Sequence, residues 1–309
     1  MRLLPYQQIL SKEDKSHVEQ YAKSLCDPWN NPAKIPLGFP VKSTCTQLVY
    51  RIPISILSTA LNIGGTSYTL TLAGNAVAFW FNPNKFDSAF MFNSSCTNGA
   101  QTLFANWNAN GTSKGYVSQM ASFRLVSAGI RFVYTGAALY AKGQVFANSG
   151  NARDQTDYGT SGTGYTNFIT DPDTVIYPIV AGLQVQRTYM PIDLDSMSFI
   201  ATNITDSNMQ DWSAFIAIDG YDSVNGISGY FDMSINYECI PSGVYEQLIG
   251  PSINPGGSEE DAKAGIDLAK KEQEYQRSRP GPNMEIKKPT EEQFIRDALD
   301  WFKRYNNLI

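Results

Sequence analysis

Apolar and polar residues alternate strictly through much of the middle of the chain. In the clearest example, the residues expected to face inward are Phe231, Met233, Ile235, Tyr237 and Cys239. The polar residues between them are expected to face outward, toward solvent: Asp232, Ser234, Asn236 and Glu238. A period of two is the side-chain period of a β-strand with one buried face. The pattern therefore predicts a strand that ends at Pro241-Ser242-Gly243.

The same periodicity predicts further strands along the chain. They are expected over residues 45–57, 68–81 with a bend at Gly74, 175–189, 197–201 and 212–218, and as a pair within 122–148. That pair predicts a long antiparallel hairpin, because two apolar and β-branched runs meet at Thr135-Gly136. Its first strand has apolar residues on both faces, which predicts cover on both sides.

Between these runs, residues 82–116 and 150–167 are polar and rich in Asn, Gly and Ser, so we expect them to form surface loops. About eight strands follow one another with no helical pattern between them, which argues against a parallel sheet with crossover helices. The predicted fold is all-β: an eight-stranded antiparallel jelly-roll sandwich with helical N- and C-terminal extensions.

The flanking segments have a different pattern. Residues 1–43 predict an N-terminal arm, with a short helix from Ser11 to about Cys26 and then a proline-rich connector. Residues 44–241 form the predicted jelly-roll domain, and residues 242–309 predict a linker and a helical C-terminal arm with a charged helix over 261–277.

A second amphipathic helix is expected near the C-terminus, after a capping box at Thr290. Its apolar stripe contains Phe294, Ile295, Leu299, Trp301, Phe302 and Tyr305. Such a helix could pack on protein, join subunits or act on a membrane. Acidic residues on its polar face favour a protein partner over anionic lipid.

Charge and apolar content exclude several classes of protein. The net charge of −5 gives no global attraction to nucleic acid or to an anionic membrane. We expect no stable membrane span, because no apolar run approaches about 18 residues. The first residues become charged too early for a signal peptide, so we expect synthesis in the cytoplasm.

Residues with chemical potential are sparse. The single histidine, His17, lies in a charged helical pattern, and no nucleophile, phosphate-loop or metalloprotease motif occurs. Four scattered cysteines favour free thiols over a zinc site or a disulfide framework. We therefore expect no enzymatic activity; catalysis by two loop aspartates ranks last among the alternatives.

Several pairs of aspartates fall in predicted loops. Those expected to be candidates for calcium bound between subunits are Asp154, Asp157, Asp193 and Asp195. Similar pairs occur at Asp171/Asp173 and Asp219/Asp222. The favoured interpretation for any one pair is an aspartate that hydrogen-bonds the backbone of its own turn.

Basic residues are interleaved with acids in the C-terminal arm. The candidates for contact with a nucleic acid are Lys263, Lys270, Lys271, Arg277, Arg279, Lys287 and Lys288. Their mixed surroundings are more typical of a solvated helix face, so any such contact is expected to be weak and local.

Three phrases resemble a known family. Cys26-Asp27-Pro28-Trp29 followed by Ile35-Pro36, the run FRLVSAGIRFVYTGAALYAKGQV, and the closing INYECIP are similar to the capsid proteins of small icosahedral positive-strand RNA viruses of the nodavirus and tombusvirus-like kind. The resemblance covers roughly residues 26–241. It implies a virion shell subunit that assembles in many copies around a single-stranded RNA genome, with a host receptor as a further partner.

The chain departs from that family in two ways. Such proteins commonly begin with an arginine-rich arm that neutralises the genome, and this sequence shows none. Scattered lysines and other cations then neutralise the genome, or the arm is missing from this chain, or assembly does not depend on it. Neither Asn283-Met284 nor Asn307-Leu308 matches the Asn-Ala pair of self-cleaving shells, so we assign no self-cleavage. The alternative to a shell protein is a β-sandwich that binds or acts on carbohydrate through its Asn- and Gly-rich loops.

Overall fold

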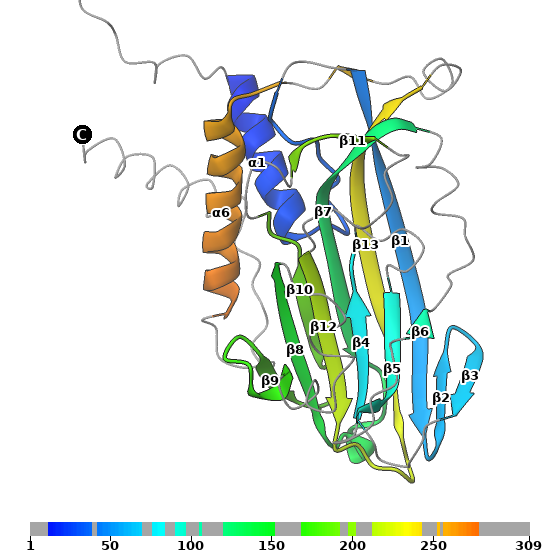
Figure 1. Ribbon diagram of the computed structural model, residues 1–309. Coiled ribbons are helices and arrows are strands. Elements are labelled where there is room, and N and C mark those ends of the chain that lie inside the picture. The colour runs from blue at the N-terminus through cyan, green and yellow to red at the C-terminus, as the bar shows by residue number, and fades with distance from the viewer. Residues whose placement is uncertain are drawn as a thin grey trace, which may run out of the picture.

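In the computed structural model, two antiparallel sheets face each other and two helices lie beside the first sheet (Figure 1). The structure describes residues 12–38, 42–69, 76–83, 90–96, 105–106, 120–151, 168–191, 197–201, 212–242, 252–253 and 256–277.

Within the described residues, the first sheet has eight strands. Its main path runs, in spatial order, through β10 (Gln184–Thr188), β7 (Met120–Tyr134), β13 (Ile227–Pro241), β1 (Lys42–Leu57), β2 (Ala60–Ile63) and β3 (Thr66–Thr69). Two short strands complete it: β11 (Ile200–Ala201) pairs with β7, and β14 (Ser252–Ile253) pairs with β1.

The second sheet has six strands. They are, in spatial order, β6 (Ala105–Asn106), β5 (Phe90–Cys96), β4 (Ala76–Phe81), β12 (Trp212–Asp219), β8 (Gln144–Asn151) and β9 (Val175–Pro178).

The path of the chain between the sheets is that of a jelly roll. In chain order, β1, β7, β10 and β13 lie in the first sheet, whereas β4, β8, β9 and β12 lie in the second. These eight strands form the neighbouring sets β10-β7-β13-β1 and β4-β12-β8-β9, and every pair within them is antiparallel. The predicted eight-stranded antiparallel jelly roll is confirmed.

Aromatic rings from both sheets fill the space between them. The ring of Phe231 on β13 lies 4.6 Å from that of Phe79 on β4, 5.3 Å from Phe90 and 5.4 Å from Phe132 on β7, measured between centroids. All four side chains are buried, and tilted contacts at these distances are the favourable arrangement for aromatic pairs. The inward-facing residues predicted for the closing strand are therefore confirmed at Phe231.

The predicted hairpin over residues 122–148 is wrong. β7 pairs with β13 and β10, β8 pairs with β12 and β9, and the two strands lie in opposite sheets. The connection between them holds the short 3-10 helix η2 (Ala138–Tyr140) and leaves Leu139 85% exposed. Thr135 N, just after β7, still donates to Ser228 O on β13 (2.9 Å), so the chain leaves the first sheet only beyond that residue. Periodicity identified both strands, but it does not specify which strands pair.

Three other sequence predictions also need correction. The segment 82–116, predicted as a loop, contains β5 and β6. The single strand predicted over 175–189 is two strands, β9 and β10, in opposite sheets and separated by a turn where Gly182 has φ +75°. The strand predicted over 68–81 likewise contains parts of β3 and β4, which lie in different sheets.

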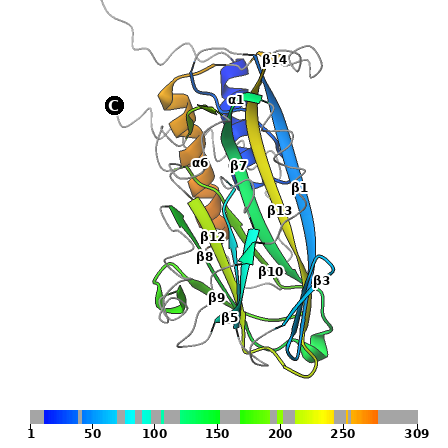
Figure 2. The same ribbon diagram turned by 45° about the vertical axis from the view of Figure 1, so that its right-hand side comes forward.

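A helical layer covers the outer face of the first sheet beside β7. Helix α1 (Lys12–Cys26) packs against β7, and α6 (Glu259–Arg277) packs against α1 (Figure 2). The predicted first helix is confirmed, and its apolar residues at helical spacing, Val18, Tyr21, Ala22 and Leu25, are buried. The predicted helix over 261–277 is also confirmed. A capping pair starts it: Asp261 N donates to Ser258 Oγ and Ser258 N donates to Asp261 Oδ2.

The prediction that the polar face of β13 is open to solvent is wrong, because the helical layer and its connector cover that face. Asp232, Ser234, Asn236 and Glu238 are all buried, none more than 2% exposed. The connector after α1 approaches so closely that a Cβ at Gly129 on β7 would lie 2.8 Å from Trp29 Cη2. β7 is therefore covered on both faces, as predicted, and the polar residues of its neighbour β13 face protein.

Candidate functional site

Many of the predicted site residues lie outside the described part of the chain. This holds for Asp154, Asp157, Asp193 and Asp195, for Arg279, Lys287 and Lys288, and for Phe294, Ile295, Leu299, Trp301, Phe302 and Tyr305. Of the basic candidates within it, Lys263, Lys270 and Lys271 are exposed on α6, and Arg277 is the last residue of that helix.

The described aspartate pairs form turns. Asp171 Oδ1 accepts a hydrogen bond from Asp173 N (2.9 Å), and Asp219 Oδ1 accepts one from Gly220 N (2.6 Å). Asp222 Oδ1 accepts from Val224 N (2.8 Å), and this bond is the main cause that lowers the pKa of the Asp222 carboxyl. The turn-forming interpretation is confirmed for these pairs. Among the described residues, no three His, Cys, Asp or Glu side chains gather as a metal site would require.

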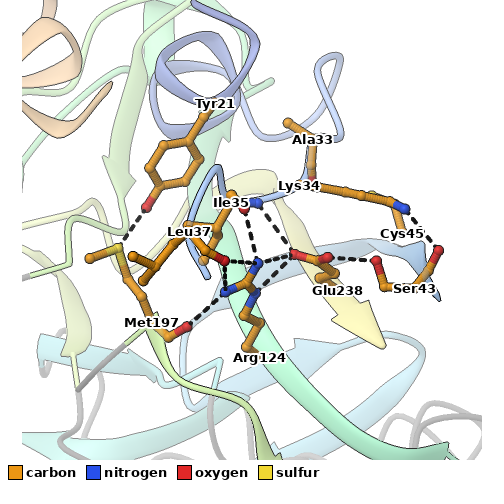
Figure 3. Close-up of polar contacts among 10 residues, drawn as sticks. All are labelled: Tyr21, Ala33, Lys34, Ile35, Leu37, Ser43, Cys45, Arg124, Met197 and Glu238. Atoms are coloured by element: carbon orange, nitrogen blue, oxygen red, sulfur yellow. Dashed lines mark hydrogen bonds and ion pairs between the residues drawn. The ribbon is translucent and has the colours of Figure 1, made fainter. Parts of the chain in front are cut away.

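A charged pair lies inside the molecule where the connector crosses the first sheet. Arg124 on β7 and Glu238 on β13 are register partners, their Nη2 and Oε2 atoms are 2.8 Å apart, and the side chains are 3% and 0% exposed. Glu238 also accepts hydrogen bonds from Ser43 Oγ (2.6 Å) and from Ile35 N (3.3 Å) (Figure 3). A buried carboxylate is tolerable only with such a set of donors.

The guanidinium of Arg124 is satisfied by backbone carbonyls. Its Nη2 donates to Ile35 O (2.9 Å), and its Nη1 donates to Met197 O (3.3 Å) and to Leu37 O (3.4 Å), as Figure 3 shows. These acceptors belong to the connector and to the segment before β11. The Arg124–Glu238 pair therefore fastens two crossing segments to the sheet.

A neutral polar cluster continues this joint toward α1. Ser24 Oγ on α1 lies 2.6 Å from Ser127 Oγ on β7, and Asn236 Nδ2 donates to Ser127 Oγ (2.8 Å). Asn236 Nδ2 and Ser234 Oγ also donate to Pro28 O, at 2.7 and 2.8 Å. The polar residues of β13 thus hydrogen-bond the Pro28 carbonyl just beyond the end of α1. Carbonyl groups at a helix C-terminus have no partner within the helix and need one from elsewhere.

A second ion cluster lies nearer the surface. Asp232 accepts two hydrogen bonds from Arg51, at 2.7 and 3.1 Å, and one from Arg131 at 2.8 Å. Arg131 stacks over the ring of Trp29 at 4.8 Å. Burial raises the pKa of the Asp232 carboxyl, but the hydrogen bonds and charges of the two arginines outweigh it, so the pKa lies below its usual value.

The two helices are joined to each other and to the sheet. Tyr21 packs on Gly265, where a Cβ would lie 2.7 Å from Tyr21 Cδ1. Cys26 Sγ donates to Ala269 O (3.7 Å), and burial raises the pKa of this thiol to about 12. Gln273 Nε2 donates to Thr188 Oγ1 on β10 (2.7 Å). Helix, helix and sheet therefore form one rigid unit.

These contacts are suited to holding segments together. Arg124 and Glu238 hydrogen-bond each other, backbone atoms of the connector and the Ser43 hydroxyl. Sequence analysis missed both residues as site candidates because their alternation resembled that of solvent-facing polar residues. The available signal was a full charge within an otherwise apolar strand, at FRLV and YECIP.

The first test concerns the buried pair. Glu238→Gln leaves the Arg124 charge buried without its counterion, so we expect the free energy of unfolding to fall by about 3–5 kcal/mol. Urea denaturation followed by circular dichroism measures this change. Adding Arg124→Met to the Glu238→Gln variant should lower the free energy of unfolding by less than Arg124→Met does in the wild type. The reason is that the double variant no longer buries an unpaired charge. Arg51→Met is the matched control. It breaks the ion pair with Asp232, in which the arginine is largely exposed, and should lower the free energy of unfolding only slightly. Equal losses for Arg51→Met and Glu238→Gln would contradict the central role of the buried pair.

The second test uses pH. Because the folded-state pKa of Asp232 is lowered, its carboxylate stabilises the fold above the unfolded-state pKa of about 4, and this contribution is lost as the pH falls through the folded-state pKa. Asp232→Asn should therefore be less stable than wild type at pH 7, and the difference should shrink between pH 4 and pH 2.5. Urea midpoints at several pH values measure it, and Arg131→Met should reduce the same pH-dependent part. A wild-type advantage that stays constant down to pH 2.5 would be incompatible with this assignment.

No helix among the described residues is long and apolar enough to cross a membrane. No protein-family model matches the chain, and no curated protein sequence matches it.

Comparison with solved structures identifies the fold. The chain is similar to a protein in T=1 particles derived from infectious bursal virus, with a TM-score of 0.53, 10% identity, and coverage of 84% of this chain and 92% of that one. It is similar to VP2 in the subviral particle of infectious bursal disease virus, with a TM-score of 0.52, 11% identity, and coverage of 82% and 94%. A chain in a semi-empty virus-like particle of the nodavirus of the giant freshwater prawn Macrobrachium rosenbergii matches with 8% identity over 78% of this chain and 98% of that one. Its TM-score of 0.39 is too low to carry an argument. Over most of its length the chain thus has the fold of the proteins in these virus particles, as the resemblance in the sequence implied.

Proposed function

We propose that the chain is a structural subunit of an icosahedral virus shell and assembles in many copies around a single-stranded RNA genome. One observation carries the proposal. Over 84% of this chain, the jelly-roll fold is similar to that of a protein in T=1 particles. At 10% identity the match supports the fold alone. Assembly into a shell and the enclosure of an RNA genome are our inference from that fold.

The physical character of the molecule supports a shell role. A subunit that must meet many identical neighbours needs surfaces held at fixed angles, because small errors accumulate around a closed symmetric assembly. The buried Arg124–Glu238 joint and the aromatic core around Phe231 provide such rigidity across both sheets and the helical layer.

We place the helical layer on the genome side of the shell. Lys263, Lys270 and Lys271 are exposed on α6, whereas Ala262 and Ile266 of the same helix are buried. Lysines on an exposed helix face can neutralise phosphates without reading sequence, and the net charge of −5 restricts that contact to such local groups.

The direct test of the proposal is assembly. The purified chain should form uniform icosahedral particles, visible by negative-stain electron microscopy and as one fast species in sedimentation velocity. Phe231→Asp, which buries a charge in the core, should abolish the particles and serves as the control for a folded sandwich. A species that remains a monomer or small oligomer at every concentration and salt tested would refute the proposal, and it would favour the carbohydrate-binding alternative.

The genome side is tested by the nucleic-acid content of the particles. The triple variant Lys263→Gln, Lys270→Gln, Lys271→Gln should still assemble but should package less RNA, because three exposed charges are removed. The ratio of absorbance at 260 and 280 nm, with extraction and sizing of the RNA, measures the loss. Lys142→Gln, an exposed lysine away from α6, is the matched control and should package RNA as wild type does. Unchanged RNA content in the triple variant would argue against this orientation.

A further inference from the structure

The helical layer leaves part of the outer face of the first sheet open. α1 and the connector cover that face as far as Trp29, whose indole packs on Gly129 of β7. Figures 1 and 2 both show that the ends of β1 and β13 nearest Leu57 and Ile227 extend beyond α1. We call this uncovered part the open face. Its outward-facing residues are Arg51, Pro53 and Ser55 on β1, Ser228, Tyr230 and Asp232 on β13, and Arg131 on β7.

Three charged side chains form one row across the open face. Arg51 on β1 and Arg131 on β7 are both register partners of Asp232, which lies between them on β13. Asp232 Oδ1 accepts from Arg51 Nε (2.7 Å), and Asp232 Oδ2 accepts from Arg131 Nη2 (2.8 Å). The side chain of Asp232 is 3% exposed, against 66% for Arg51 and 28% for Arg131. The row therefore presents two cationic groups to solvent and keeps its single carboxylate covered.

Each of the two arginines also lies over an aromatic ring. Cζ of Arg51 is 4.7 Å from the centroid of the Tyr230 ring, and Cζ of Arg131 is 4.8 Å from that of the Trp29 ring. Ring contact and ion pair together hold each guanidinium in one orientation. A flat guanidinium that is held in place and open to solvent is a surface on which a nucleobase can stack.

The surroundings of the row are polar, and Asp232 is the only acidic residue of the open face. Neighbouring outward positions on the described strands hold uncharged polar residues: Ser55, Asn62, Gln184, Gln186 and Ser228. The turn before β13 carries two further acids, Asp219 and Asp222. Their carboxylates accept hydrogen bonds from the backbone of that turn, and Lys142 acts electrostatically on Asp222. Within the open face, two arginines therefore outnumber one covered carboxylate, which favours an anionic partner.

We propose that the open face binds single-stranded RNA, with a base stacked against Arg51 and Tyr230 and a neighbouring phosphate contacted by Arg131. The proposal rests on the shell function proposed above and gives the enclosed genome a specific place on the subunit. A sheet face that carries aromatic and arginine side chains is a platform on which unpaired bases spread and stack. A duplex hides the faces of its bases, so it cannot use such a platform.

The open face lies on the same side of the first sheet as the exposed lysines of α6. Gln273 of α6 donates to Thr188 Oγ1 on β10, and Thr188 is the register partner of Gly129. Gly129 lies two residues before Arg131 on β7, on the same face of that strand. An RNA strand that passes Lys270 and its neighbours on α6 can therefore continue onto the open face without crossing the sheet.

The test measures binding of a fluorescent oligouridine to the full chain by anisotropy, below the concentration at which particles form. Wild type should bind it about tenfold or more tightly than an RNA duplex of the same length. Arg51→Gln with Tyr230→Leu should weaken binding about tenfold or more, because the stacked base is lost. Arg51→Lys keeps the charge without the flat stacking surface, so it should lose most of the same affinity. Lys42→Gln removes an exposed cation at the other end of β1 and should bind as wild type does.

Arg51→Lys alone keeps the test decisive if the change at the half-buried Tyr230 disturbs the fold, because the Arg51 side chain is largely exposed. Its far-UV circular dichroism should match that of wild type. If the duplex binds as tightly as the single strand, or if Arg51→Lys binds as wild type does, charge alone explains the binding and the inference is overturned. Equal weakening by Lys42→Gln would overturn it as well. Particle formation is measured separately, so the shell function stands in each of these cases. A chain that never assembles but keeps the selective binding would remove the shell function and support the RNA site.

Discussion

The structure depends on one buried ion pair more than on any other single contact. Arg124 and Glu238 bridge neighbouring strands of the first sheet, yet most of their remaining hydrogen bonds go to segments outside that sheet. Removing two charges from water is unfavourable, and their mutual attraction offsets this only with good geometry and full hydrogen bonding. Ser43, the connector backbone and the Met197 carbonyl supply those bonds, so the pair is tolerable only when these segments are in place. A folded sheet therefore requires a docked connector.

That requirement explains the layered arrangement of the molecule. The aromatic core between the sheets follows from alternation and hydrophobic burial. The outer face of the first sheet is different, because it is polar and still buried, and it makes specific hydrogen bonds to the backbone after α1. Apolar faces tolerate many packings, whereas a polar face accepts only a partner that matches its donors and acceptors. The helical layer is consequently fixed in position, and Gly38 and Gly257 extend the joint by exchanging two backbone hydrogen bonds between the connector and the start of α6.

Sequence reasoning identified what local pattern determines. The alternation at residues 231–239 and the helical patterns from Ser11 to Cys26 and over 261–277 each specify an element without reference to the rest of the chain. It failed where the answer depends on partners distant in sequence. Ser122–Asn148 contains two real strands, but their assignment to opposite sheets is decided by their partners β13 and β12, about 60 to 120 residues further along. The polar face of β13 was mistaken for a solvent face because the sequence of the strand itself contains no signal that α1 and its connector will bury it.

The close approach of Trp29 to Gly129 has a consequence for how the sequence can vary. Any side chain at residue 129 would collide with the indole and with the ring of Pro28, and those rings lie there because the Pro28 carbonyl is held by Ser234 and Asn236. The glycine, the proline-tryptophan pair and the two polar residues of β13 are thus tied together, although they lie up to about 200 residues apart in the chain. Among related sequences these positions should change together or remain unchanged together. Such a correlated set would identify relatives whose N-terminal helix and connector pack on the first sheet more reliably than overall sequence identity does.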